Sequence, residues 1–236
     1  MTTKESSTFA ILCWNIQKRS LTREFQREFD HLLKLYPATF IALQEVKVAE
    51  GKLPIHFQNF HHALNCNFRY KSYCYGVMTL STLGFISHTN FTTRVKEAGV
   101  ATKKSALLSR HRLHNGQTLA LLNLHAINFV PHLFFEKELK RITGLIESLE
   151  DRNLIVAGDF NTWSKKRQKA LERSMKLYNL ERVFPNNETA LKSVLGRPLD
   201  HIYYRGHKLL SAQVIDTDVS DHNPIYARFS ADRESP

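Results

Sequence analysis

The sequence contains few cysteines, and their arrangement excludes a metal ribbon or a redox pair. Its 236 residues include Cys13, Cys66 and Cys74, and no two of them form a CxxC motif. The total is odd, and the N-terminal segment MTTKESST lacks the apolar stretch of a secretion signal. We therefore expect three free thiols, a buried Cys13 and a cytoplasmic location. The alternative is a bridge between Cys66 and Cys74.

Several motifs of common catalytic chemistries are also missing. The chain has no GxGxxG, GxxxxGK[ST], HExxH or GxSxG motif, which argues against dinucleotide, P-loop, zincin and serine-hydrolase chemistry. No window of about 18 apolar residues exists, so we expect no membrane span.

Basic residues are abundant. Lys and Arg number 33 against 22 Asp and Glu, which gives a formal net charge of +11. A basic excess of this size favours polyanionic partners such as nucleic acid, anionic lipid or phosphorylated metabolites. The hydrophobic fraction of 42% is enough for a sizeable core and excludes general disorder.

The apolar pattern predicts one α/β domain over residues 9–230, between polar tails at 1–8 and 231–236. Spacings of three and four predict helices over 21–36, 133–149 and about 165–179. Apolar runs predict strands, including FAILCWN, FIALQE, LALLNLH, NLIVAGDFN, LDHIYYRG, LLSAQVI and NPIYARF. Residues 46–115 mix aromatic and polar residues without a clean period, and only short strands at 75–80, 83–87 and 106–109 are predicted there.

Two strand–helix–strand units place polar groups directly after their strands. Asn15 and Glu45 are 30 residues apart in the first unit, and His125 and Asp159 are 34 apart in the second. α/β proteins build sites at such strand ends. If the units pack sheet on sheet, we expect all four groups at one rim.

Glu45, at the end of FIALQE, is a candidate ligand for a divalent cation. Mg²⁺ takes oxygen ligands, keeps several waters and usually binds through one or two carboxylates. A cation of this kind offsets phosphate charge during phosphodiester cleavage. The alternative is a solvent-exposed glutamate at a strand terminus.

The segment GDFN places Asp159 and Asn161 two residues apart, so an extended backbone points them to the same side. A carboxylate beside an amide suits activating a water while hydrogen-bonding a phosphate oxygen. The alternative is an Asx turn after a strand.

The segment SDHNP holds adjacent Asp221 and His222, whose side chains diverge in extended backbone. A histidine usually needs a separate carboxylate to fix its tautomer, and Asp200 in PLDHIYY is a candidate. Asp221 is then free to face a metal. The alternative is a capped turn before a strand.

In NLHAIN, His125 and Asn128 are candidates to hold a leaving group and a phosphate oxygen. The alternative for His125 is a structural hydrogen-bonding residue at the end of an apolar strand.

Six motifs in this order resemble the endonuclease/exonuclease/phosphatase superfamily, whose members include DNase I-like nucleases. They cover essentially the whole chain and read WNIQ, LQE, NLHAIN, GDFN, LDHIYY and SDHNP. The segments GVMTLS, KSAL, GDFNTWS and RPLDHIYYRG are similar to the uncharacterised YafD-like bacterial branch of that superfamily.

The resemblance implies a four-layer α-β-β-α sandwich and dependence on Mg²⁺ or Mn²⁺. It implies that Glu45 is a metal ligand, with Asn15 adjoining it and Asp221 near the metal. The resemblance also implies that Asp159 and Asn161 orient the water and the phosphate. It implies that His222 contacts the scissile phosphate and is positioned by Asp200. For His125 it implies a DNase I-like role.

Substrate contacts are expected from Trp163, by stacking on a base, and from Lys165, Lys166 and Arg167, by gripping phosphates. The alternatives are a packing role for the tryptophan and a solvated helix face for the basic run. We expect a monomeric phosphodiesterase, with DNA or RNA as its substrate. Two other functions remain open: a phosphatase or phosphodiesterase acting on inositol phosphates or lipid headgroups, and a catalytically silent nucleic-acid-binding module.

Overall fold

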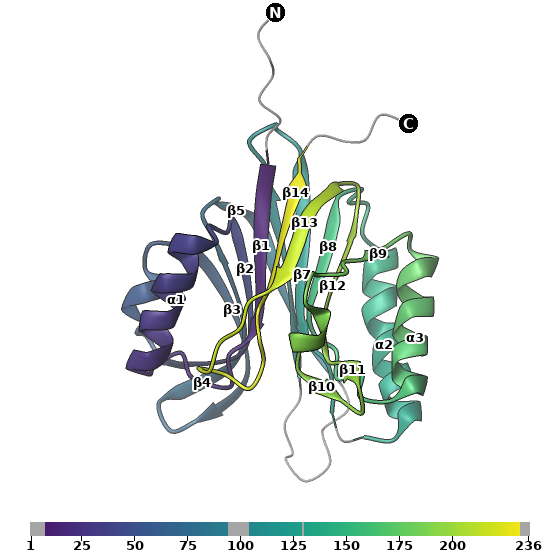
Figure 1. The fold of residues 1–236 in the computed structure, drawn as a ribbon, viewed down its shortest axis with the longest axis horizontal. Coiled ribbons are helices and arrows are strands. Elements are labelled where there is room, and N and C mark those ends of the chain that lie inside the picture. Colours follow the sequence, from purple (N-terminus) through teal and green to yellow (C-terminus); the bar gives the residue numbers. More distant parts are fainter. Residues whose placement is uncertain (1–7, 94–103, 129, 232–236) are drawn as a thin grey trace, which may run out of the picture.

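The chain folds into two six-stranded β-sheets packed face to face, with helices on both outer sides (Figure 1). The computed structural model describes residues 8–93, 104–128 and 130–231. The expected four-layer α-β-β-α sandwich is thereby confirmed, whereas most of the two expected polar tails lies outside the described residues. Within those residues, no helix has the length and apolar character needed to cross a bilayer.

The first sheet has the order β13-β14-β1-β2-β4-β3, and the second has the order β5-β6-β7-β8-β12-β9. The strands of the first sheet are β1 (Thr8–Asn15), β2 (Phe40–Ala49), β3 (His61–Tyr70), β4 (Tyr73–Ser81), β13 (Lys208–Val214) and β14 (Ile225–Ser230). Those of the second are β5 (Phe85–Thr92), β6 (Ser105–Arg112), β7 (Thr118–His125), β8 (Leu154–Asp159), β9 (Glu181–Arg182) and β12 (Asp200–Arg205). A small ribbon pairs β10 (Ser193–Val194) with β11 (Arg197–Pro198).

The helices α1 (Arg23–Leu35), α2 (His132–Glu147) and α3 (Lys165–Leu177) lie within a few residues of their predicted bounds. Thr22 caps α1 by accepting a hydrogen bond from the Phe25 amide, and Ser164 caps α3 in the same way. Short 3-10 turns occur at η1 (Ile55–Phe57) and η2 (Glu188–Ala190). Helix α1 covers the first sheet, and α2 and α3 cover the second (Figure 1).

The two predicted strand–helix–strand units form the centre of the sandwich. In each unit the two strands are parallel neighbours: β1 pairs with β2, and β7 pairs with β8. Because the four strands are buried on both faces, they read as nearly continuous apolar runs. A single apolar layer between the sheets joins residues such as Ile11, Phe40, Leu121 and Ile155.

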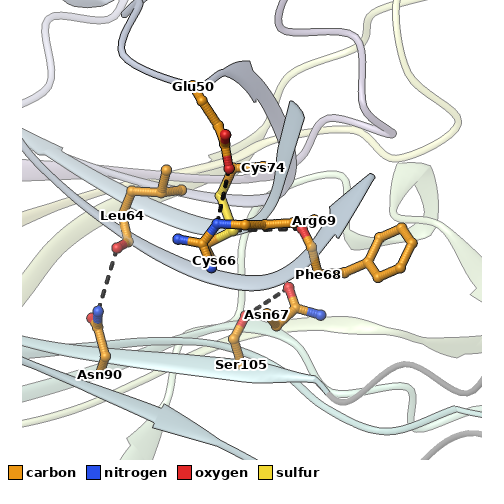
Figure 2. Close-up of a disulfide and its surroundings, with 9 residues drawn as sticks. All are labelled: Glu50, Leu64, Cys66, Asn67, Phe68, Arg69, Cys74, Asn90 and Ser105. Atoms are coloured by element: carbon orange, nitrogen blue, oxygen red, sulfur yellow. Dashed lines mark hydrogen bonds and ion pairs between the residues drawn. A yellow bond between two sulfur atoms is a disulfide. The ribbon is translucent and has the colours of Figure 1, made fainter. Parts of the chain in front are cut away.

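The prediction of three free thiols is wrong in this structure, because Cys66 and Cys74 form a disulfide (Figure 2). Strands β3 and β4 are joined by a tight turn, which brings the two Cα atoms to 5.6 Å, inside the usual disulfide range. Cys13 is a buried free thiol, as expected.

Candidate active site

The ends of the central strands bring the predicted polar groups to one rim of the sandwich. Asn15 ends β1, His125 ends β7 and Asp159 ends β8, while Asp200 begins β12 directly opposite Asp159. The Asn15 side chain donates a 3.0 Å hydrogen bond to Oδ2 of Asp159, which links the two sheets. The rim is therefore built from both halves of the chain.

Two backbone features shape this rim. The register of β2 shifts between Leu43 and Val46, and Glu45 lies in this bulge with φ 51°. In β8, a Cβ atom on Gly158 would lie 1.8 Å from the carbonyl oxygen of Leu124, and its φ is 150°. Only glycine permits this close approach of β8 to β7 just before Asp159.

Asp200 and His222 form the hydrogen-bonded pair that the sequence indicates. Nδ1 of His222 lies 2.6 Å from Oδ2 of Asp200, and both side chains are buried. Burial alone would lower the pKa of His222, but the carboxylate of Asp200, aided by Asp159 and Asp221, raises it to about 9. The ring is thus an imidazolium at neutral pH.

Further contacts fix the loop that carries His222. Its carbonyl oxygen accepts a 2.8 Å hydrogen bond from the indole of Trp14, and its amide donates to the hydroxyl of Ser220. Ser220 in turn donates to the carbonyl of Asn15. The imidazolium is therefore held against the end of β1 by backbone contacts as well as by Asp200.

Asp159 lies between its neighbours with both oxygens engaged. Oδ1 accepts a 2.9 Å hydrogen bond from the Asn161 amide, and Oδ2 lies 3.5 Å from Nε2 of His125. Burial, together with the nearby Asp200, raises the pKa of Asp159. Asn161 is in the left-handed region with φ 52°, and its side chain donates to the carbonyl of Ala126.

His125 is buried and neutral, because burial, with help from Lys104, lowers its pKa to about 3. Nζ of Lys104 lies 3.1 Å from Nε2 of His125, and Oε1 of Glu45 lies 3.9 Å from the same nitrogen. Glu45 also pairs with Lys18 at 2.9 Å. Lys18, which the sequence interpretation missed, and Lys104, which lies in a basic stretch of the sequence, therefore bring two ammonium groups to the acidic rim.

Two places at the rim can be tested for a divalent cation. Asp159, Asp200 and His222 each offer one ligand atom, all within 4.8 Å of one another, and Oδ1 of Asp200 is buried without a hydrogen-bond partner in the described part of the chain. However, Nδ1 of His222 is already engaged by Oδ2 of Asp200, which leaves fewer free ligand atoms in this group. Glu45, with 22% of its side chain exposed and already facing an ammonium group, is the more suitable anchor.

The remaining predicted residues make contacts outside the rim or are exposed. Asp221 is 42% exposed and pairs with Lys192 at 2.5 Å. The indole of Trp163 donates to Oδ1 of Asn128 at 3.0 Å, so these two side chains bind each other. Lys165 and Lys166 are exposed at the start of α3.

Arg167 differs from the expectation of a phosphate contact, because it is only 1% exposed. Its guanidinium donates to the carbonyls of Ile127, Val130 and Asn161 and lies over the rings of Phe135 and Trp163. A buried guanidinium with these partners positions the loops around Asn161. The sequence signal for its burial is its spacing of three and four residues from Ala170 and Leu171, which both lie on the buried face of α3.

A second polar pair, also missed, lies between the sheets behind the rim. Gln44 and Asn123 are fully buried, and Nε2 of Gln44 donates a 2.7 Å hydrogen bond to Oδ1 of Asn123. Asn123 donates in turn to the carbonyl of Met78. Polar residues inside otherwise apolar strands are the sequence signal for such a pair.

The family model described as the Endonuclease/Exonuclease/phosphatase family matches residues 12–222. The chain belongs to this family, as its motifs indicate. Its relatives are UPF0294 proteins. The UPF0294 protein plu0699 of Photorhabdus laumondii subsp. laumondii is 34% identical over 226 residues, which cover 93% of this chain and 82% of that protein. The UPF0294 protein of Vibrio campbellii is 37% identical over 137 residues, which cover 57% of this chain and 48% of that protein. The chain thus matches about half the length of this Vibrio relative.

Solved structures of low identity share the fold. An endonuclease/exonuclease/phosphatase from Beutenbergia cavernae DSM 12333 has a TM-score of 0.73 at 12% identity, with 95% of this chain and 72% of that chain covered. The human Nocturnin catalytic domain with bound sulfate anion has a TM-score of 0.72 at 16% identity, with 95% and 93% covered.

Proposed function

We propose that this protein is a phosphodiesterase dependent on Mg²⁺ or Mn²⁺, with nucleic acid as its substrate. The observation that carries the proposal is the buried Asp200–His222 pair at 2.6 Å, beside Asp159 on the same rim. An imidazolium with a pKa of about 9 faces a group of carboxylates, and such a group needs positive charge to accept a phosphate.

The residues divide the work as follows. His222 neutralises charge on the phosphate as the phosphorus becomes pentavalent, and Asp200 keeps its ring in one orientation. Asp159, held by the Asn161 amide and by Asn15, accepts a proton from the attacking water. The pKa of Asp159 is raised, which makes its carboxylate a better proton acceptor.

Glu45 would hold the divalent cation, together with Asn15 and Asp221 at its margin. The cation, when bound, supplies positive charge for the phosphate and the leaving oxygen. Lys18 and Lys104 lie on the same side and attract a polyanion to the rim. His125, neutral and next to Glu45, is suited to hydrogen-bonding the leaving group.

Lys165 and Lys166 remain candidates for contact with flanking phosphates, because both are exposed. Trp163 and Asn128 are candidates as a bound pair rather than singly. A phosphatase acting on inositol phosphates or lipid headgroups would use the same rim. Comparing hydrolysis of these substrates with hydrolysis of nucleic acid distinguishes it from a nuclease.

The disulfide bears on the cellular location. Disulfides persist in oxidising compartments and are rare in the cytoplasm. The bond between Cys66 and Cys74 therefore favours an oxidising compartment, contrary to the location expected from the sequence.

The test is hydrolysis of bis(p-nitrophenyl) phosphate with Mg²⁺ and with EDTA. Glu45→Gln keeps the shape of the side chain and removes its charge, so we expect a loss of about 10²-fold or more in kcat, partly restored by excess Mg²⁺. Glu150→Gln is the control, since Glu150 is exposed just before β8, at the opposite end of that strand from Asp159. Full metal-dependent turnover by Glu45→Gln would show that the cation is held elsewhere.

A further inference from the structure

The hairpin of β3 and β4 extends one face of the first sheet past the point where the second sheet covers it. Thr79 accepts a hydrogen bond from Asn123, and Val77 packs against Leu107 of the second sheet. Alternate residues of a strand share a face, so Tyr75 and Tyr73 continue this inner face toward the hairpin turn.

Aromatic rings and a lysine occupy this extension. Phe68 lies opposite Tyr75 and Tyr70 opposite Tyr73, while Lys47 lies opposite Tyr75 on the other side. The rings of Phe68 and Tyr70 are parallel within 7°, with centroids 6.4 Å apart, and those of Phe68 and Tyr75 are 5.7 Å apart. We call these five residues the aromatic platform.

Two rings of the platform are exposed, and lysines lie near its tyrosine rings. Phe68 is 41% exposed and Tyr70 is 56% exposed. Nζ of Lys47 lies 4.3 Å from the centre of the Tyr73 ring, and Nζ of Lys71 lies 5.6 Å from that of Tyr70. Between residues 46 and 75 the only acidic residue in the sequence is Glu50, and Arg69 pairs with it (Figure 2).

The platform begins beside the catalytic rim. Lys47 is two residues beyond Glu45 in β2, so it lies at most about 7 Å further along the chain. The next row of rings, from Tyr70 and Tyr73, lies about 7 Å further along. A strand whose scissile phosphate lies at Glu45 therefore reaches the rings with its neighbouring nucleotides.

Resting on the proposed function, we propose that the aromatic platform stacks unpaired bases of the substrate, so that the enzyme prefers single-stranded nucleic acid or unpaired ends. Every base has a π face, and stacking on aromatic side chains combined with basic groups is the common mode of single-strand binding. A duplex keeps its bases stacked inside the helix and offers none to these rings.

A lipid surface fits the platform less well. The rings lie on the face that continues toward the second sheet, and the hairpin turn itself, at Lys71 and Ser72, is polar. Insertion into a bilayer would require apolar residues at the turn.

The experiment measures binding of oligonucleotides in EDTA, where no metal-dependent cleavage occurs. Phe68→Leu and Tyr70→Leu keep apolar bulk and remove the aromatic face. We expect each to weaken binding of a single-stranded oligonucleotide by about tenfold. In the wild type, a 2-aminopurine base in the oligonucleotide should be quenched on binding, and this quenching should be lost in both variants.

Phe184→Leu is the matched control, because Phe184 is 65% exposed outside the hairpin, and its affinity should match that of the wild type. Thermal melting checks that each variant is folded. Three results would overturn the proposal. The first is an unchanged affinity for single strands in both leucine variants, and the second is an equal affinity of the wild type for duplex and single strand. The third is binding to phosphatidylserine vesicles, retained by both leucine variants, in place of oligonucleotide binding. Hydrolysis of bis(p-nitrophenyl) phosphate stays as the separate readout of the proposed function, so the two can fail independently.

Discussion

Replacing Arg167 by methionine tests whether this residue holds the site loops or grips substrate. Methionine keeps an unbranched apolar stem and removes the guanidinium. Within the part of the chain that the structure describes, that group donates to the carbonyls of Ile127, Val130 and Asn161, at 3.2, 2.7 and 3.1 Å.

The cost can be worked from these contacts. Each buried carbonyl left without its donor costs about 1 kcal/mol, the low end for a buried unsatisfied group, which gives about 3 kcal/mol for three. The guanidinium also lies 4.6 Å from the Phe135 ring centre and 4.5 Å from that of Trp163, and such desolvated contacts contribute about 1 kcal/mol or more. Release of the buried charge offsets part of this loss. We therefore expect the free energy of unfolding to fall by about 2–4 kcal/mol.

Urea unfolding followed by circular dichroism measures this free energy. Lys166→Met, one residue earlier and exposed, is the matched control and should change it by less than about 0.5 kcal/mol. The salt dependence of oligonucleotide binding should stay the same in Arg167→Met, because no phosphate contact is removed. A stable Arg167→Met with a reduced salt slope would show that Arg167 is a phosphate contact after all.

Three further predictions follow from buried groups. Asp200→Asn should lower the pKa of His222 from about 9, because burial then acts with less opposition; in the pH–rate profile, activity should be lost at a lower pH as the pH rises, and an unchanged alkaline limb would contradict this. Burial lowers the pKa of His111 to about 4, so the folded state resists protonation that the unfolded chain accepts below about 6.5. The contribution of His111 to the free energy of unfolding should be constant above that value and fall by about 3 kcal/mol as the pH drops toward 4. Urea unfolding of His111→Gln should lack this part of the loss. Thiol titration of the denatured, unreduced protein should find one group, and three after reduction, because Cys66 and Cys74 are joined; three groups before reduction would rule out the bond.

The helices and central strands could be predicted because their burial is simple. Helix α1 buries Phe25, Phe29 and Leu32 on one face, and Thr22 caps its start. The helical spacing of the apolar residues and the capping residue therefore indicate the same helix. The strands of the two central units are buried on both sides, so they stand out as apolar runs.

The β3–β4 hairpin was predicted only in part, because its burial changes along its length: the strand expected at 75–80 lies within β4, whereas β3 was not predicted. The half near Ala63 lies under the second sheet, whereas the half near Tyr70 faces solvent on the same side. Bulges at Cys66/Phe68 in β3 and at Leu43/Val46 in β2 also break the alternation of period two. The cysteine pairing was predicted wrongly for another reason, because the odd number of cysteines and the N-terminal segment favoured free thiols.

The site was partly predictable. Asn15, Glu45, His125 and Asp159 could be predicted because each directly follows an apolar run. The direction of a strand determines the edge of the sheet at which such a residue lies. Lys18 and Lys104 reach the rim from outside the six motifs, and no periodicity encodes those approaches.

The bond from Asn15 to Asp159 joins the two sheets at the place where a ligand would bind. A ligand held by Glu45 on one sheet and Asp159 on the other acts as a clamp between the halves of the molecule. Its binding free energy adds to the stability of the whole sandwich. Ligand binding should therefore raise the temperature of global unfolding, and its effect should not be limited to the motion of one loop. The converse follows from the proposed function: a cavity introduced in the apolar layer between the sheets would shift the two sheets relative to each other and displace the residues of the rim. Large-to-small substitutions in this layer are therefore expected to lower kcat as well as stability.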